Sequence, residues 1–197
     1  MINITPSEGK LLLKIFKDFS HNYNANSISK ETSITSRGAL KMLKKLSSQN
    51  ILISKQLGKA VFYKINFENN YALKLIETLL IAESKEKAER WINELEEVFR
   101  HTESVILFGS IIKNEKKARE IDVILVLNKK KYKEISNFIE RKNKILFKKI
   151  HEIPQTINDL KENLQKNNKA LIDAIKEGYV LHGQDKIIKV IKNVTSF

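Results

Sequence analysis

Cysteine is missing from this chain of 197 residues, which excludes disulfides and thiolate zinc sites. Histidine is scarce, and the four that occur include no close pair of the kind that binds zinc. No apolar run approaches the ~20 residues that a membrane span needs. The first ten residues, MINITPSEGK, lack the basic and apolar regions of a signal peptide. We therefore expect a cytoplasmic protein that has no membrane partner.

Positive charge is plentiful, with a formal net charge of +13. Such an excess favours a polyanion as partner, because contacts to phosphates release counterions. A lysine-rich proteome would spread the charge everywhere, but here it is uneven. Residues 1–68 carry 11 Lys and Arg against 4 Asp and Glu, whereas residues 69–99 carry 4 against 7. The basic excess lies at both ends of the chain, and the middle is acidic.

The first third of the chain alternates helical periodicity with turn residues. The pattern predicts three helices: one after the capping box Thr5-Pro6-Ser7-Glu8, a short one at 28–32 capped by Ser27, and a third at 36–48 capped by Thr35. Two strands should follow, at 51–56 and 61–66, on either side of a turn at Gly58.

The expected helix 36–48 has a broad apolar face and an opposite arc that is basic, with no acidic residue in it. The cations of this arc are Arg37, Lys41, Lys44 and Lys45. Three helices followed by a hairpin resemble the winged helix-turn-helix family over about residues 5–67. The resemblance implies that the basic helix enters a major groove of double-stranded DNA, and that the wing around Lys59 contacts the backbone. The alternative is a winged helix that contacts protein and leaves its basic face solvated.

A long segment without Gly or Pro follows, from residue 71 to residue 99. Its apolar stripe predicts one long helix, or two abutting helices with a break near 82–84. This helix should connect two domains. It could also supply the seam of a homodimer, or it could simply pack on its own domains.

The second half predicts a mixed sheet flanked by helices. The expected elements are strands at 104–108, 120–127, 144–153 and 179–183, and helices at 111–117, 131–141, 158–177 and 184–193. With the winged helix, this gives an α+β protein with a winged helix-turn-helix domain at 1–68, a connecting helix at 69–99 and a second domain at 100–197.

Two carboxylates stand one residue apart at the start of the expected strand 120–127. The two-residue period of a strand puts Glu120 and Asp122 on one face, where they repel each other unless a cation such as Mg²⁺ binds between them. The turn at Gly109-Ser110 leaves backbone N–H groups and a hydroxyl free for phosphate oxygens. Lys113 and Arg119 lie between the two motifs as further phosphate contacts.

Gly109-Ser110, followed after ten residues by Glu120-Ile121-Asp122 on a strand, resembles the signature of polymerase-beta-type minimal nucleotidyltransferases. The resemblance covers about residues 99–183. It implies that Glu120 and Asp122 are catalytic residues that bind Mg²⁺ or Mn²⁺ together with a nucleoside triphosphate. The sequence departs from the family in two places. Glu120 replaces the usual Asp, and the third carboxylate should fall where His151 stands, with Glu152 on the opposite strand face. Neutral histidine is a poor ligand for Mg²⁺.

Three functions remain open from the sequence. The protein could transfer a nucleoside monophosphate from a triphosphate to an acceptor hydroxyl. It could instead be a DNA-binding transcription regulator whose nucleotidyltransferase-like domain is catalytically degenerate. By family analogy, it could also be an antitoxin-like protein that modifies or binds a partner protein.

Overall fold

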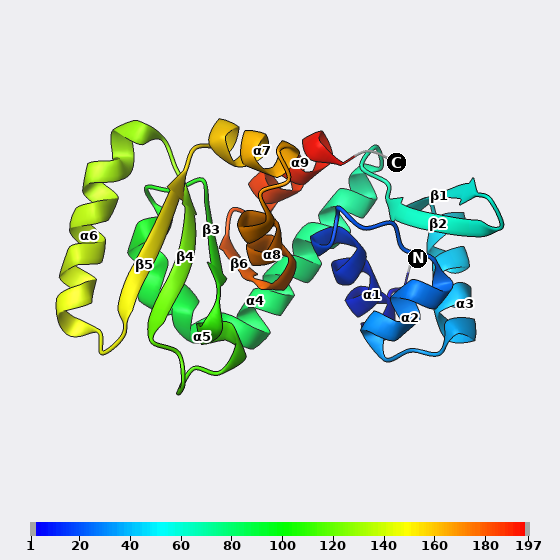
Figure 1. Cartoon of the computed structure of the whole chain (residues 1–197), viewed down its shortest axis with the longest axis horizontal. Coiled ribbons are helices and arrows are strands. Elements are labelled where there is room, and N and C mark those ends of the chain that lie inside the picture. The colour runs from blue at the N-terminus through cyan, green and yellow to red at the C-terminus, as the bar shows by residue number, and fades with distance from the viewer. Residues whose placement is uncertain (1–2, 196–197) are drawn as a thin grey trace. The chain divides into compact units, whose positions relative to one another are not determined.

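The structure, a computed structural model, describes residues 3–195, and it divides into two compact units (Figure 1). Unit 1 extends to Leu79 and includes Thr195, whereas unit 2 covers Leu80–Val194. Helices and two small sheets give a mixed α+β protein, as predicted. Within the described residues, every helix is too short or too polar to cross a bilayer.

Unit 1 has the element order of a winged helix-turn-helix. Its elements are α1 (Pro6–Lys17), α2 (Ala25–Thr32), α3 (Ser36–Ser48), β1 (Leu52–Leu57), β2 (Ala60–Ile65) and the first part of α4 (Asn70–Phe99). The capping box predicted at Thr5 and Glu8 begins α1, and Thr35 caps α3. The two strands form an antiparallel hairpin around the Gly58-Lys59 turn. The helices and hairpin enclose a core whose largest side chains include Leu11, Leu12, Phe16, Ile28, Leu43 and Leu46.

The cap of the second helix differs from the prediction. Asn24, rather than Ser27, is the N-cap of α2, because its side chain accepts hydrogen bonds from the backbone N–H groups of Asn26 and Ser27. The Ser27 hydroxyl completes a capping box by accepting from the Asn24 backbone N–H at 2.9 Å. The helix is therefore three residues longer at its start than the sequence indicated.

The long segment α4 consists of two helical stretches that meet at a kink. The predicted break near 82–84 is misplaced, because the non-helical residue is Ala88, with φ −142° and ψ 22°. The apolar stripe is largely used inside the two units. Ile76 is buried in unit 1, and Trp91 and Leu95 belong to the core of unit 2. The homodimer that the stripe suggested remains a prediction.

Unit 2 is built on a four-stranded mixed sheet in the order β5-β4-β3-β6. Its further elements are β3 (Ser104–Phe108), α5 (Ser110–Lys113), β4 (Glu120–Val126), the 3-10 turn η1 (Lys129–Lys131), α6 (Tyr132–Ile145), β5 (Lys149–Gln155), α7 (Ile157–Gln165), α8 (Lys169–Glu177), β6 (Tyr179–His182) and α9 (Gln184–Val194). Strand β3 pairs antiparallel with both β4 and β6, whereas β4 and β5 are parallel.

Helices cover both faces of this sheet (Figure 1). The second part of α4 packs with α6 against one face, and their apolar side chains share a core with Val105, Val123 and Ile150. Helices α7, α8 and α9 contact the strands from the other face. Because Glu120 and Asp122 alternate with the core residues Ile121 and Val123, the two carboxylates belong to the α7–α9 face.

The boundary between α6 and β5 lies later than predicted. Helix α6 continues to Ile145 and ends where Leu146 turns to extended backbone, and its last turns make ion pairs with α4, from Arg141 to Glu97 and from Lys142 to Glu94. Strand β5 consequently starts at Lys149 and runs through Pro154. A proline is tolerated there because β5 is an edge strand.

Two further helices are shorter than predicted. The segment expected as one helix at 158–177 is split into α7 and α8, since Asn167 takes a left-handed conformation with φ 55° and the Asn168 side chain caps α8. Helix α5 ends at Lys113, because Asn114 is already extended. The following loop, residues 114–119, leads into β4.

Candidate functional site

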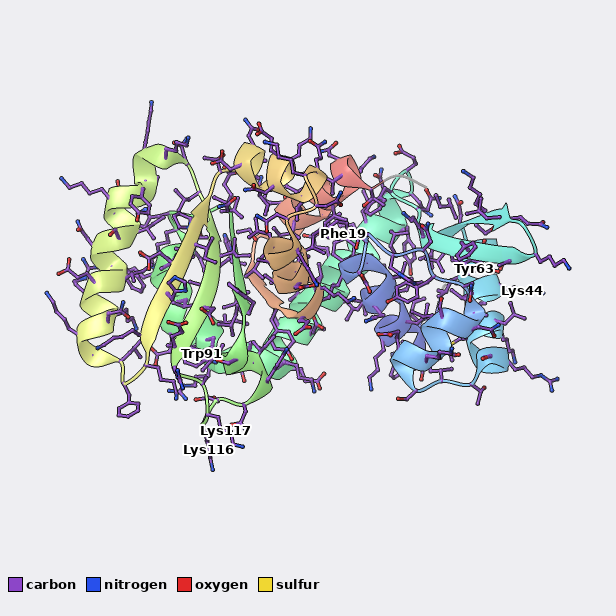
Figure 2. The ribbon with its side chains drawn as sticks, viewed as in Figure 1. Phe19, Lys44, Tyr63, Trp91, Lys116 and Lys117 are labelled. Carbon is purple, nitrogen blue, oxygen red and sulfur yellow. The ribbon has the colours of Figure 1, made fainter. Side chains whose placement is uncertain are left out.

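The exposed side of α3 carries the predicted basic residues of unit 1. Arg37, Lys41 and Lys44 are solvent-exposed, while Leu43 and Leu46 on the opposite side are fully buried. Figure 2 shows Lys44 at the outer surface of this unit. Arg37, Lys41 and Lys44 also line an open hollow of about 520 Å³ together with Thr35, Gly38 and Leu40. The arc is thus an exposed, basic surface on a well-packed helix.

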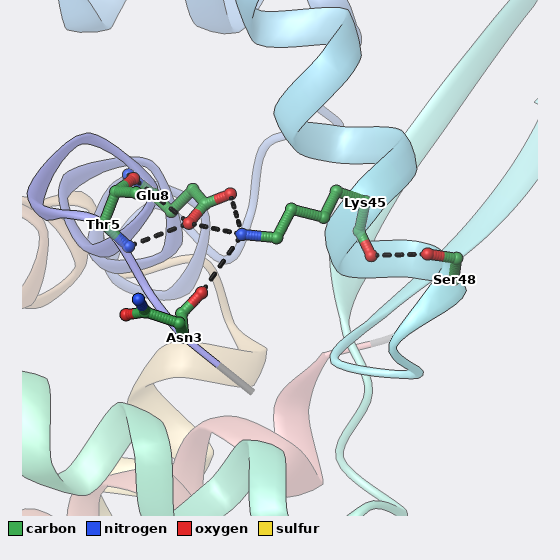
Figure 3. A network of polar contacts seen from close by, with 5 residues as sticks. All are labelled: Asn3, Thr5, Glu8, Lys45 and Ser48. Atoms are coloured by element: carbon green, nitrogen blue, oxygen red, sulfur yellow. Dashed lines mark hydrogen bonds and ion pairs between the residues drawn. The ribbon is translucent and has the colours of Figure 1, made fainter. Parts of the chain in front are cut away.

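Lys45 has a different environment from the other cations of α3. Its ammonium donates to both carboxylate oxygens of Glu8, at 2.8 and 3.1 Å, and to the backbone carbonyl of Asn3 at 3.1 Å (Figure 3). The Glu8 side chain is only 4% exposed. Lys45 therefore ties α3 to the start of α1, and its charge is matched inside unit 1.

The ion pair and the capping box together set the ionisation of Glu8. Burial alone would raise the pKa of this carboxyl, but hydrogen bonds from Lys45 and Thr5 outweigh it and hold the pKa below its ordinary value. The backbone N–H and the hydroxyl of Thr5 bond one carboxylate oxygen at 2.8 and 3.1 Å. Glu8 is therefore both a helix cap and the partner of Lys45.

The wing places Lys59 at an exposed tip. Gly58 has φ +62° and supplies the left-handed backbone that this two-residue turn requires. The turn is open, with no atom within 4 Å of the position that a Cβ on Gly58 would take. Lys59 is thus exposed at the end of the hairpin.

In unit 2, the structure brings Asp122 against the turn that follows β3. Phe108 and Asp122 are partners in the antiparallel register, and Gly109 comes next in the chain. A Cβ on Gly109 would lie 2.2 Å from Oδ2 of Asp122, and the φ of +81° also favours glycine. The Asp122 side chain is only 15% exposed. Glycine at this position is therefore what allows the carboxylate and the turn to approach so closely.

His151 completes a cluster with the two carboxylates. The parallel register sets Asp122 opposite His151 and Val123 opposite Glu152, which directs Glu152 to the other face of the sheet. Nδ1 of His151 lies 3.1 Å from Oδ1 of Asp122. Glu120, Asp122 and His151 each offer one donor atom within 4.8 Å of the others, the one such group of three found in residues 3–195. The Asp122 hydrogen bond raises the pKa of His151, which is largely exposed.

Of the cations predicted to bind phosphate, one already has an anionic partner. Lys113 is paired with Glu177 at 2.6 Å. Arg119 is exposed at the end of the loop before β4, and Lys116 and Lys117 lie at the tip of the same loop and point away from the sheet (Figure 2). Ser110 begins α5 directly after Gly109. The turn, the loop and the carboxylates are thus at the same end of the sheet.

Two features beside this cluster were missed from the sequence. The ammonium of Lys148 donates to the carbonyl of Ala118, which fixes the segment before β5 to the loop before β4. Phe147 in that segment is 97% exposed. The lysine-rich run did not indicate the Lys148 contact, because it depends on the pairing of β4 with β5. The exposure of Phe147 had no local signal, because this residue directly follows the apolar Ile145 and Leu146.

No protein-family model matches the chain, and no curated protein matches it. Solved structures of three mutants of Lactococcus lactis ZitR are similar to it. One single mutant is 15% identical, covers 72% of this chain and 74% of its own, and has a TM-score of 0.36. A double mutant is 15% identical with 71% and 73% covered and a TM-score of 0.36. Another single mutant is 14% identical, with the same coverage and a TM-score of 0.34. Likeness at this level carries no argument about function.

Proposed function

We propose that this protein is a DNA-binding transcription regulator that contacts double-stranded DNA through α3 and the wing. The observation that carries the proposal is the exposed arc of Arg37, Lys41 and Lys44 around an open hollow. A helix of this kind fits a major groove, where lysines contact phosphates and an arginine near the helix start can read a base edge. Lys59 in the wing would add a backbone contact. Lys45 serves the scaffold instead, because Glu8 holds it.

The test is a titration of fluorescently labelled duplex DNA with the full chain, followed by anisotropy at several salt concentrations. Binding through phosphate contacts requires that log K falls linearly with log salt, by about 0.9 for each contact. Three to four contacts would give a slope of about −3. An affinity that is indifferent to salt, or no binding at 50 mM salt, would contradict the proposal.

We further propose that unit 2 is a nucleotidyltransferase-like domain that binds a divalent cation and a nucleoside triphosphate. Glu120 and Asp122 would hold the ion, and two carboxylates together with substrate phosphates are a common arrangement for Mg²⁺ and Mn²⁺. The Gly109-Ser110 turn and Arg119 would contact the phosphates. Lys113 could join them only by leaving Glu177, with which it is paired.

Transfer of a nucleoside monophosphate is the second candidate function, and one observation favours it. Gly109 and Asp122 approach each other, as they must if the turn is to contact the phosphates and the carboxylate is to hold the ion bound to those phosphates. The bound ion would supply charge stabilisation to the leaving pyrophosphate. A third carboxylate that could activate an acceptor hydroxyl is replaced by His151 in the register. This replacement supports the regulator as the principal function and transfer as the alternative.

The transfer candidate is tested by incubating the chain with α-³²P-labelled triphosphates, Mg²⁺ or Mn²⁺, and cell extract as a source of acceptors. Label that enters protein or nucleic acid in the wild type, and not in Asp122→Asn, would support transfer. If triphosphate binds in calorimetry and no label is transferred, the domain is a binding module only.

A further inference from the structure

The third group beside the paired carboxylates is a nitrogen donor. In residues 3–195, Glu120, Asp122 and His151 form the group whose donor atoms lie within 4.8 Å of one another. The sheet sets this geometry, since Asp122 and His151 are register partners on adjacent parallel strands and Glu120 precedes Asp122 on the same face. The arrangement does not depend on a loop.

This donor set disagrees with a site made for Mg²⁺. Magnesium is a hard ion that takes oxygen ligands, whereas imidazole suits Zn²⁺, Fe²⁺, Ni²⁺ and Cu²⁺, and carboxylates suit Mn²⁺ as well as Mg²⁺. An Mg²⁺ site at this position would have to leave His151 outside the coordination sphere. Its Nδ1, however, already lies 3.1 Å from Oδ1 of Asp122.

That spacing suits two ligands of one ion. Zinc binds imidazole nitrogen and carboxylate oxygen at about 2.0–2.2 Å in tetrahedral geometry, so two such donors lie about 3.4 Å apart, which is close to the 3.1 Å between Nδ1 of His151 and Oδ1 of Asp122. The Asp122 carboxylate already lies against the turn, because Gly109 has no Cβ to keep it away. The His151 side chain is 57% exposed, which leaves the remaining coordination positions open to water or to phosphate oxygens.

We infer that Glu120, Asp122 and His151 form a mixed oxygen and nitrogen centre that prefers a first-row transition ion, Zn²⁺ or Mn²⁺, over Mg²⁺. This inference rests on the proposed cation site of unit 2 and specifies its third ligand and its metal class. The replacement of a carboxylate by histidine then changes the metal that the site takes, and it is not simply a loss of function.

An ion pair without any metal is the competing explanation for the contact between His151 and Asp122. The chain offers a matched control for it, because His101 lies 3.0 Å from Glu134 and is also partly exposed. That pair is not part of a group of three donors among the described residues. If histidine–carboxylate pairs alone attracted metal, removing His101 would weaken binding as much as removing His151.

The experiment is calorimetry of the full chain with ZnCl₂, MnCl₂ or MgCl₂ alone, on the wild type and on H151A, H151D, H101A and D122N. We expect the wild type to bind Zn²⁺ at least about tenfold more tightly than Mg²⁺, because imidazole nitrogen is a ligand that suits Zn²⁺ and not Mg²⁺. H151A should weaken Zn²⁺ binding about tenfold or more and leave Mg²⁺ unchanged. H151D should bind Mg²⁺ more tightly, and H101A should match the wild type.

A second readout reports the nitrogen ligand directly. Co²⁺ in place of Zn²⁺ gives visible absorption bands that depend on its ligands, so the bands should differ between the wild type and H151D while both bind the ion. Identical Co²⁺ spectra, together with equal Zn²⁺ affinity for the wild type and H151A, would overturn the inference.

The outcomes separate this inference from the proposed function on which it rests. If D122N loses binding of every ion and H151A changes none of them, the two-carboxylate site stands and the third ligand is refuted. If D122N and H151A both bind all three ions like the wild type, the cation site itself is refuted, and the inference falls with it.

Discussion

Lys45 on α3 and Glu8 on α1 form an ion pair of 2.8 Å between residues 37 positions apart in the chain. The carboxylate is almost fully buried, while the lysine is 41% exposed. The pair joins α3, the proposed DNA-binding helix, to the N-terminal helix α1, and the Glu8 carboxylate also caps α1. The pair therefore gives two neighbouring lysines different roles. Lys44 is exposed on the surface of α3, whereas Lys45 links α3 to α1.

Removing Lys45 should destabilise unit 1. Lys45→Ala leaves a buried carboxylate with only Thr5 as partner, and a buried charged acceptor that loses a bond costs about 1–3 kcal/mol. Urea unfolding should show a lower midpoint with the same slope. The Lys44→Ala variant is the matched control, since Lys44 is exposed and should unfold like the wild type. Equal midpoints for both variants would show that the pair contributes nothing to stability.

The same carboxylate predicts how stability depends on pH. The folded-state pKa of Glu8 lies below its ordinary value of 4.5, so the unfolded chain binds the proton more tightly than the folded chain does. The stabilisation by ionised Glu8 is therefore complete above pH 4.5 and is lost as the pH falls through the lower folded pKa.

This dependence is measured by comparing the wild type with Glu8→Gln. The wild type should be the more stable of the two at pH 7, and the difference should shrink as the pH falls below 4.5. Glu8→Gln keeps the shape of the side chain but cannot ionise. A difference that stays constant between pH 7 and pH 3 would mean that the charge of Glu8 is not the source of the stability.

DNA binding should depend on the exposed lysines of α3. Replacing Lys41 and Lys44 together by Ala should weaken binding to every duplex sequence and reduce the salt slope by about 1.8, which is about 0.9 for each lost phosphate contact. The matched control removes the same charge from unit 2, through Lys116→Ala and Lys117→Ala. If the control lowers affinity and slope as much as the α3 variant, net charge is responsible and α3 is not the DNA-binding element.

The sequence predicted these surfaces well where local signals were strong. The capping box at Thr5, the cap at Thr35 and the Gly58 turn each fix a boundary through residues close in the chain. It failed where distant contacts decide. The last turns of α6 pair with α4, which is distant in the sequence, and the partner of Lys45 is Glu8. The helical wheel of α3 contains no acid, so it could not show that pair.

The candidate site in unit 2 was predicted in part for the same reason. Alternation along a strand placed Glu120 and Asp122 on one face, and β4 has that strand geometry. The register of His151 against Asp122 agrees with the predicted one, although β5 begins five residues later than expected.

The homodimer remains a prediction, which sedimentation at micromolar concentration can test. Ile81 is 47% exposed on α4 and would have to lie in such a seam.

The approach of Gly109 to Asp122 predicts that alanine substitutions at Gly109 and at Gly58 will differ in their effect on metal binding. Gly109 has φ 81° and ψ −152°, a region that is essentially restricted to glycine, and Gly58 has φ 62°. Gly109→Ala should cost about 1–3 kcal/mol from backbone strain. Its new Cβ would also meet Oδ2 of Asp122 at 2.2 Å, so the carboxylate must move away from its position opposite His151.

Gly58→Ala is the control that separates strain from the clash. It also places a side chain at positive φ, at a cost of about 1–2 kcal/mol, but its Cβ meets nothing within 4 Å. Both variants should therefore unfold at lower urea concentration than the wild type, whereas only Gly109→Ala should lose metal binding when titrated with Zn²⁺. If Gly109→Ala binds Zn²⁺ like Gly58→Ala, then Asp122 does not need its position against the turn, and the cation site cannot be built on that carboxylate as described.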